Sequence, residues 1–265
     1  ITVAYLSGGQ KAAERRESLK KIADGTADVI LGTHALITEG VAFYRLGLAI
    51  TDEQHRFGVR QRTALSGKSC QVHTLVMTAT PIPRTLSLIL YGDLDISIID
   101  ELPAGRKKIK TIAIFENQRA KMDDFVLAQL DAGRQAYFIC PLIEESEVIE
   151  ANAVDSYLEK LKRGVYRKKR IAALHGRMKS AEKEMIMTQF VKGEIDALVS
   201  TTVIEVGVDV PNASVMVIEN AERFGLSQLH QLRGRVGRGS WQSYCVLLCA
   251  GHGAFAKERM QVMCD

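Results

Sequence analysis

The chain has 265 residues, of which 46% are hydrophobic and 25% are charged. These fractions are ordinary for a globular protein, and they exclude a disordered tail, a collagen-like fibre and a disulfide-stapled miniprotein. The net charge of +4 is a small basic excess that does not by itself establish a nucleic-acid partner.

The first part of the chain alternates short apolar runs with amphipathic segments. The pattern predicts strands at 2–6, 28–31, 46–51 and 72–77, and helices at 10–24 and 83–90. Gly25 is expected to end the first helix, because glycine readily takes the left-handed conformation that follows helix C termini. Because Ile1 reads as part of a strand, we expect the first domain to be truncated at its N terminus.

Residues 103–110 combine proline, glycine and basic residues, which is typical of a linker. After it the pattern resumes, with strands predicted at 111–115, 136–140, 171–174, 197–200, 215–219 and 244–249. Helices are predicted at 118–132, 153–163, 181–191 and 227–236. Apolar strands that alternate with helices indicate parallel sheets covered on both faces. We therefore predict an α/β fold with two tandem parallel-sheet domains, at 1–102 and 111–265.

The composition also bears on the cellular compartment. No run of about 18 apolar residues is present, so we expect no membrane span, and the start has no pattern of a secretory signal. The five cysteines are scattered, and no nearby histidines complete a zinc site. We therefore expect free, buried thiols in a reducing cytosol.

The first chemical signature is Asp52-Glu53-Gln54-His55, at the exit of a predicted buried strand. Acidic residues there are costly unless they hold a cation or take part in proton chemistry. Asp52 is suited to position Mg²⁺, and Glu53 to orient a water that attacks a phosphate. The alternative interpretation is a surface turn.

Further signatures lie in the second half. The segment 231–239 holds three arginines in six residues, of which Arg235 and Arg238 are expected to share one face of a helical turn. Arginines presented in this way can neutralise charge on a transferring phosphoryl group. The alternatives are a basic turn that faces DNA or a network of ion pairs. In the segment 200–209, Gly207 permits close backbone approach, and Asp209 is placed to meet a ribose or an arginine.

The positive charge is uneven. Residues 1–102 carry no net charge, so the excess of +4 lies in residues 103–265. It is concentrated in two basic runs, 106–110 and 160–170. Each run is either a solvated surface or a contact with a phosphate backbone.

Taken together, these motifs resemble the motor of superfamily-2 helicases and, more narrowly, the RecG family of branched-DNA helicases. The resemblance covers nearly the whole chain and is most specific at 52–59, 78–85, 91–95 and 221–238. Transcription-repair coupling factors share the general pattern but typically carry glutamate where this chain has Gln54, so they rank second.

The resemblance implies two RecA-like domains that use ATP and Mg²⁺ to move double-stranded and branched DNA in repair and recombination. It implies a monomeric bacterial protein of the cytosol, associated with the nucleoid and not with a membrane. Asp52 and Glu53 would hold Mg²⁺ and the attacking water, while Gln54, His55 and residues 78–80 complete the catalytic and coupling machinery. The expected nucleotide-binding residues are Gly207, Asp209, Gln231, Arg235 and Arg238. The expected DNA-backbone contacts are Gly32, Thr33, His34, Arg84, His175, Gly176, Arg177, Thr201 and Thr202.

The chain also departs from the family. It contains no G-x-x-x-x-G-K-S/T phosphate loop. The family carries that loop upstream of the strand that opens this chain, and its wedge domain and a C-terminal element beyond the motor are not recognised here. We therefore expect this segment by itself to hydrolyse ATP poorly.

Two functions from other classes compete with the motor. One is a nucleic-acid binding module that uses the basic second half without ATP, and it predicts a steep salt dependence of binding. The other is a metal hydrolase, which would need a close cluster of ligands that the spacing of the histidines does not provide.

Overall fold

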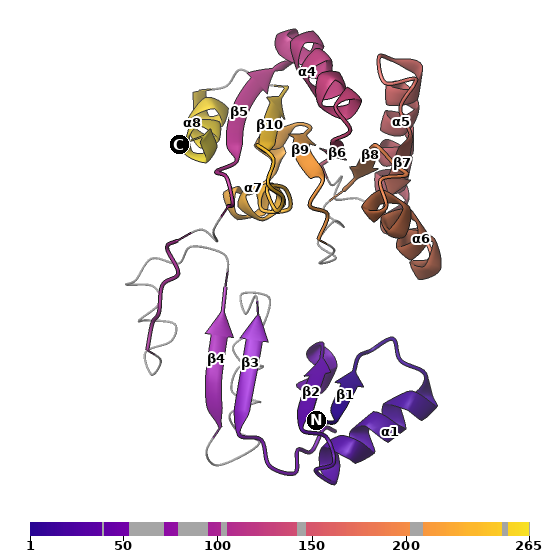
Figure 1. Cartoon of the computed structure of the whole chain (residues 1–265), viewed down its shortest axis with the longest axis vertical. Helices are drawn as coiled ribbons and strands as arrows, with labels where there is room; N and C mark the ends of the chain where they lie inside the picture. Colours follow the sequence, from indigo (N-terminus) through magenta and orange to yellow (C-terminus); the bar gives the residue numbers. More distant parts are fainter. Residues whose placement is uncertain are drawn as a thin grey trace. The chain divides into compact units, whose positions relative to one another are not determined.

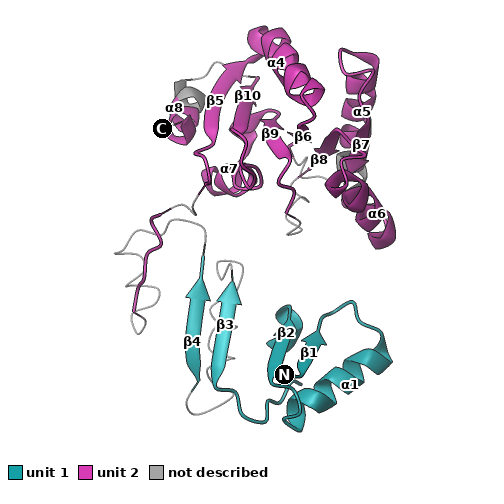
Figure 2. Cartoon of the chain, in the orientation of Figure 1, with its two compact units in different colours: residues 1–90 teal, residues 91–265 magenta. Residues whose placement is uncertain are grey.

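The structure is a computed structural model that describes residues 1–38, 40–52, 72–78, 95–101, 105–141, 147–201, 209–250 and 254–264. The chain divides into two compact units, residues 1–90 and 91–265 (Figure 2). Within the described ranges, no helix has both the length and the apolar character needed to cross a membrane.

The first unit contains two separate pairs of parallel strands. Strand β1 (Val3–Leu6) pairs with β2 (Val29–Gly32), and β3 (Leu48–Asp52) pairs with β4 (His73–Met77). Helix α1 (Ala12–Ala23) packs against β1, and the short 3-10 helix η1 (His34–Leu36) follows β2 (Figure 1). These elements confirm the predicted strands and the first helix, whereas the helix predicted at 83–90 lies outside the described residues.

Strand β1 is buried on one side within the first unit. Its residues alternate, with Ala4 and Leu6 buried in a small core while Val3 and Tyr5 are exposed. Apolar residues on both sides of a strand are typical of a sheet that is covered on both faces. Among the described residues, the small core around Ala4 and Leu6 covers one of these two faces.

The second unit is built on a six-stranded parallel sheet with the order β5-β10-β9-β6-β8-β7. The strands are β5 (Lys110–Phe115), β6 (Gln135–Ile139), β7 (Ile171–Leu174), β8 (Ala197–Ser200), β9 (Ala213–Ile218) and β10 (Tyr244–Cys249). Short 3-10 helices, η3 (Glu116–Gln118) and η5 (Ala221–Arg223), follow β5 and β9. The parallel pairing confirms the predicted α/β fold.

Helices cover both faces of this sheet (Figure 1). Helices α4 (Arg119–Asp131) and α5 (Glu147–Arg163) pack on one face. On the other face lie α6 (Ser180–Val191), α7 (Leu226–Arg233) and α8 (Ala254–Cys264). Because both faces are covered, β6, β8 and β9 are buried along their whole length, as their continuous apolar sequences predict.

The cysteines bear out part of the sequence analysis. Cys140, Cys245 and Cys249 are free and buried, and Cys70 lies outside the described residues. Burial raises the pKa of Cys140 to about 12, so its thiol stays protonated at neutral pH.

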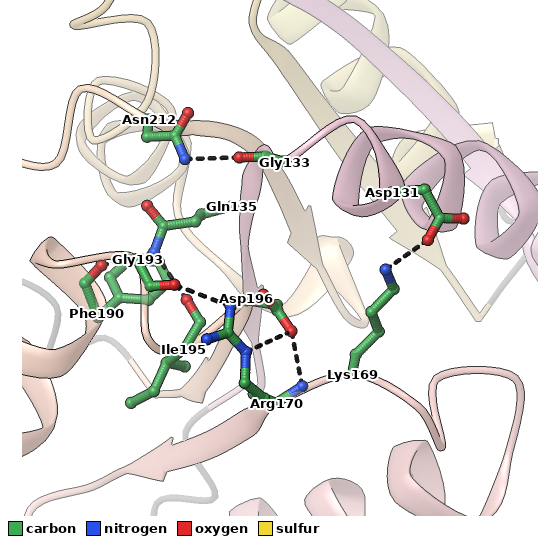
Figure 3. Close-up of polar contacts among 10 residues, drawn as sticks. All are labelled: Asp131, Gly133, Gln135, Lys169, Arg170, Phe190, Gly193, Ile195, Asp196 and Asn212. Atoms are coloured by element: carbon green, nitrogen blue, oxygen red, sulfur yellow. Dashed lines mark hydrogen bonds and ion pairs between the residues drawn. The ribbon is translucent and has the colours of Figure 1, made fainter.

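Side-chain amides tie the loops together at the amino edge of this sheet (Figure 3). The Gln135 amide donates to the backbone oxygens of Phe190 and Ile195 at 2.6 and 2.8 Å. Asn212 donates to the backbone oxygen of Gly133 at 2.8 Å. These bonds join the loops that precede β6, β8 and β9, at the edge opposite the carboxyl ends of the strands.

Three helices differ from the prediction. Helix α5 begins at Glu147, six residues earlier than predicted, and α8 was not predicted. Helix α7 ends at Arg233 instead of continuing to 236, because Gly234 caps it and Gly237 takes a φ of +80° that no helix accommodates.

Candidate functional site

The acidic signature of the first unit begins at the carboxyl end of β3. Asp52 is the last residue of β3 and is aligned with Met77 of β4, so Thr78 follows at the same edge. Asp52 is exposed to solvent. Ligands bind at this edge in open parallel sheets. The structure therefore brings Asp52 and Thr78 together.

Several predicted residues of this region lie outside the described residues, and their placement stays a prediction. These are Glu53, Gln54, His55, Ala79, Thr80 and Arg84.

The Gly32-Thr33-His34 segment forms a tight turn at the exit of β2. A Cβ atom on Gly32 would meet the backbone oxygen of Leu6, and it would lie 2.8 Å from Cγ of Leu36. Only glycine fits here without displacing its neighbours. Thr33 donates its backbone N–H to Leu6 O at 3.2 Å, and both Thr33 and His34 are exposed. The turn therefore presents Thr33 and His34 to solvent.

In the second unit, His175 and Thr201 follow the adjacent strands β7 and β8 at the carboxyl edge of the sheet. Both are buried, with exposed fractions of 8% for His175 and 1% for Thr201. Within the part of the chain that the structure describes, His175 Nδ1 and Thr201 Oγ1 have no hydrogen-bond partner. A buried polar atom without a partner costs about 1–3 kcal/mol. A ligand atom that reaches these two groups would recover that cost.

The turn after His175 leads into α6. Arg177 is exposed in this turn, and Lys183 of α6 donates to the backbone oxygen of Gly176 at 2.8 Å. The predicted DNA contacts His175, Arg177 and Thr201 thus lie at one edge of the sheet, while Thr202 lies outside the described residues.

The arginine motif begins on α7, which carries Gln231 and Arg233, and continues into a loop that carries Arg235 and Arg238. The prediction that Arg235 and Arg238 share a helical turn is wrong, because the chain leaves the helix at Gly234 and turns again at Gly237. The structure nevertheless brings the motif to Asp209, since Arg238 Nη1 lies 3.8 Å from Asp209 Oδ1. Gly207 lies outside the described residues.

A buried tyrosine lies beside this group of charges. Burial raises the pKa of Tyr137, and the nearby positive charges of Arg238 and Arg235 act to lower it. Sequence reasoning missed Tyr137 because it lies in an otherwise apolar strand.

The remaining arginine of the motif, Arg233, connects three elements of the second unit. Arg233 donates to the backbone oxygen of Met263 at 3.0 Å and to Thr111 Oγ1 at 3.4 Å. Its guanidinium also lies 3.1 Å from His230 Nδ1. Arg233 therefore joins α7 to α8 and β5, and Gln231 is half-buried on the same helix.

A buried ion pair stands at the carboxyl end of β9. Arg119 donates two hydrogen bonds to Glu219, at 2.9 and 2.6 Å, and the Tyr157 hydroxyl donates to the same carboxylate at 2.5 Å. Burial acts to lower the pKa of Arg119, but hydrogen bonds to Glu219 and Glu116 outweigh it, so the pKa is raised. The partners are 100 residues apart in sequence, and the sequence analysis did not identify them.

The basic run at 160–170 is partly structural. Lys169 pairs with Asp131 at 2.5 Å, and Arg170 binds Asp196 through two guanidinium nitrogens (Figure 3). These two cations therefore join loops of the same unit, whereas Lys162 and Lys168 are exposed.

Comparison with known families identifies the second unit more closely. Residues 117–240 match the model of the helicase conserved C-terminal domain. This range runs from the start of α4 through the arginine motif.

Known relatives match the whole chain. It is 53% identical over 263 residues to the ATP-dependent DNA helicase RecG of Synechocystis sp., in a match that covers 99% of this chain and 32% of the relative. It is 52% identical over 271 residues to RecG of Escherichia coli K12, in a match that covers 100% of this chain and 39% of the relative. The chain thus spans 32% and 39% of the lengths of these two curated relatives.

Solved structures agree with the fold. A structure of RecG bound to a three-way DNA junction superposes with a TM-score of 0.71 at 45% sequence identity, covering 100% of this chain and 34% of that one. A helicase Lhr from Mycobacterium smegmatis, bound to single-stranded DNA and AMP-PNP, gives a TM-score of 0.69 at 17% identity over 99% of this chain and 37% of that one. At that identity the likeness shows the fold, which is that of RecA-like helicase domains.

Proposed function

Since the chain belongs to the RecG family of helicases, we propose that the protein that contains it is an ATP-driven DNA translocase that remodels branched DNA in repair and recombination. The observation that carries this proposal is the identity of about half of all residues, over the whole chain, to ATP-dependent DNA helicases. Transcription-repair coupling factors, the second interpretation of the motifs, are not favoured by these matches.

The acidic signature would serve Mg·ATP. Asp52 offers an exposed carboxylate at a strand end, which suits a hard cation that prefers oxygen ligands and keeps much of its water. Bound Mg²⁺ would neutralise charge on the phosphates. Glu53 then orients the attacking water, and Gln54, His55 and Thr78 relay the state of the nucleotide to the rest of the motor.

The arginine motif would bind the γ-phosphate through Arg235 and Arg238. The Arg238–Asp209 pair is long and solvent-accessible, so its contribution is about 0–1 kcal/mol. Such a weak pair releases the guanidinium to a phosphate without much cost. Asp209 and Gly207 approach the nucleotide, and Gln231 links the motif to them.

The carboxyl edge of the second unit would grip the DNA backbone. His175 Nδ1 and Thr201 Oγ1, which lack partners among the described residues, supply hydrogen bonds for phosphates, and the exposed Arg177 beside the Gly176 turn supplies positive charge. Gly32, Thr33, His34, Arg84 and Thr202 would make the matching backbone contacts elsewhere in the chain. Such contacts fix the register of a motor on DNA without reading its sequence.

We propose a division into two RecA-like domains, 1–102 and 111–265, with a linker at 103–110. Two observations support a division into two parts: the structure has two compact units, and residues 117–240 match a helicase domain. The compact units divide between residues 90 and 91, before the proposed linker. We also propose that the protein is a monomer of the bacterial cytosol, which sedimentation and fractionation would test.

The chain contains no G-x-x-x-x-G-K-S/T sequence. That loop cradles the phosphates of ATP in motors of this kind. We therefore expect the 265-residue chain by itself to hydrolyse ATP very slowly, and robust turnover at micromolar ATP would contradict this.

The proposed function is tested by Glu53→Gln in the full-length protein. Removing the carboxylate should leave ATP binding intact and abolish DNA-stimulated hydrolysis, because the water loses the group that orients it. The control is Glu101→Gln, which removes an exposed glutamate outside the proposed site and should change neither. Unchanged turnover in Glu53→Gln would refute its role. DNA binding with no effect of ATP, in the unmutated protein, would favour a binding module instead.

A further inference from the structure

Residues 105–110, of which Lys110 begins β5, lie against the loop between α7 and β10. We call this loop, residues 234–243, the arginine loop, because it carries Arg235 and Arg238. Arg106 reaches this loop with its side chain, and its Nε donates to the backbone oxygen of Gly237 at 3.0 Å. The contact is partly buried and joins residues 131 positions apart in sequence. Gly237 stands between the two arginines of the proposed nucleotide site, so Arg106 is bonded to the backbone of the arginine loop itself.

Three further contacts run along the same two segments. Gln242 donates its amide to the backbone oxygen of Lys108 at 2.8 Å. Lys110 donates its backbone N–H to Ser243 O at 2.9 Å. Ile109 packs so closely on Gly237 that a Cβ atom there would lie 2.8 Å from Ile109 Cγ1. The segment and the loop are therefore joined at both ends and in the middle.

The far side of the arginine loop is also anchored. A Cβ atom on Gly239 would meet the backbone oxygen of Pro211, so the loop lies directly on the segment that enters β9. The Arg134 guanidinium lies 3.2 Å from the centroid of the Trp241 ring. A displacement of the segment 105–110 would therefore act on the loop through Arg106, Ile109 and Gln242.

We propose that Arg106 is a positioning residue that fastens the segment 105–110 to the arginine loop, so that movement of the segment and placement of Arg235 and Arg238 on the nucleotide are coupled. This inference rests on the proposed function, because it assigns the arginines to the γ-phosphate. In the sequence, this segment connects the part of the chain with the acidic signature to the part with the arginine motif. Through Arg106, the position of the segment 105–110 would thus affect whether Arg235 and Arg238 reach the nucleotide.

The structure separates this role from a contact with DNA. Arg106 is half-buried and its Nε is already bonded within the unit, whereas Lys107 and Lys108 beside it are exposed. The two lysines are therefore the more solvent-accessible charges of this segment. Lys107 therefore provides a matched control, since its removal takes away the same charge from the same segment without breaking the contact to Gly237.

The first experiment measures ATP hydrolysis and DNA affinity of the full-length protein with Arg106→Ala, Arg106→Lys and Lys107→Ala. Arg106→Ala should lower kcat for DNA-stimulated hydrolysis about threefold to tenfold, as expected for the loss of one charge-assisted hydrogen bond. Its Kd for DNA should stay within about twofold of the parent value. Arg106→Lys should recover part of kcat, because a lysine ammonium can donate to the same carbonyl. Lys107→Ala should keep the parental kcat.

Two results would overturn the inference. One is an equal loss of kcat in Arg106→Ala and Lys107→Ala, and the other is a loss of DNA affinity in Arg106→Ala with kcat unchanged. Either result would show that Arg106 acts by contributing positive charge to a DNA-binding surface.

The second experiment does not depend on activity. Amide hydrogen exchange of the full-length protein reports the hydrogen-bonded N–H groups of Arg235, Val236 and Lys110. Their exchange should accelerate at least about fivefold in Arg106→Ala and stay at the parental rate in Lys107→Ala. Equal exchange rates in both variants and in the parent protein would refute the proposal that Arg106 holds the arginine loop. If the parent protein shows no DNA-stimulated hydrolysis, the proposed function fails, while exchange still decides whether Arg106 holds the loop.

Discussion

The buried pair between Arg119 and Glu219 provides a quantitative test of what holds the second unit together. Replacing Arg119 by Met removes both hydrogen bonds to a carboxylate whose side chain is only 8% exposed. Removing one partner of a buried ion pair costs about 3–5 kcal/mol, because the remaining charge is left unpaired. Glu219 keeps the hydrogen bond from Tyr157, so we expect a loss near the lower end, about 3 kcal/mol.

Arg170→Met is the matched control. Arg170 also binds a carboxylate through two nitrogens, but its side chain is 58% exposed, against 19% for Arg119. An exposed pair contributes about 0–1 kcal/mol, so the control should lose no more than that. Both variants lose a two-nitrogen contact to a carboxylate, and they differ in the burial of that contact. Arg119→Met also loses the exposed contact to Glu116, and Arg170→Met loses a bond to the backbone oxygen of Gly193.

The assay is urea unfolding of the 265-residue chain followed by fluorescence. Trp241 is the only tryptophan of the chain and lies in the second unit, so its emission reports that unit. With a urea dependence of about 2 kcal/mol per molar, Arg119→Met should move the midpoint down by about 1.5 M. The double variant Arg119→Met with Glu219→Leu should recover most of this loss, because two apolar side chains leave no buried charge. Equal losses in Arg119→Met and Arg170→Met, or no recovery in the double variant, would refute the reasoning.

Two other residues give further predictions. Burial, and then the charge of Arg233, lower the pKa of His230 below its ordinary value of 6.5. Its contribution to stability is therefore full above pH 6.5 and is lost as the pH falls from 6.5 through the lowered pKa. His230→Gln should therefore flatten the decline in unfolding free energy between about pH 7 and 5 seen in urea titrations, and an unchanged slope would contradict this. Gly237→Ala should cost about 1–2 kcal/mol, because φ is +80° and the new methyl group would press on Ile109. Gly133→Ala, at a φ of +77° with open space around it, should cost less in the same assay, and an equal loss would show that the contact with Ile109 is unimportant.

The regular elements of the fold could be predicted from the sequence because their signals are local. Each strand of the second unit is a short apolar run, and β6 and β9 are examples that the structure buries on both faces. The end of α7 was predicted wrongly because the three-residue spacing of Arg235 and Arg238 also fits a helix. Gly234 and the positive φ of Gly237 decide the local conformation instead.

In the candidate site, too, residues with a local sequence signal could be predicted and residues with long-range contacts could not. Asp52, Asp209 and Arg238 stand out in the sequence because charged residues beside apolar strands require an explanation. Arg106 stands out only as part of a basic run, since its bond to Gly237 joins residues 131 positions apart that the fold brings together. Long-range pairs of this kind leave no local pattern to read.

The central claim is that this chain is part of an ATP-driven motor for branched DNA. The most direct test is ATP hydrolysis by the full-length protein with a three-way DNA junction and with linear duplex of the same length and composition. We predict that hydrolysis depends on DNA, is faster with the junction, and is lost in Arg238→Ala. Hydrolysis that is independent of DNA, or equal stimulation by both substrates with full activity in Arg238→Ala, would contradict the claim.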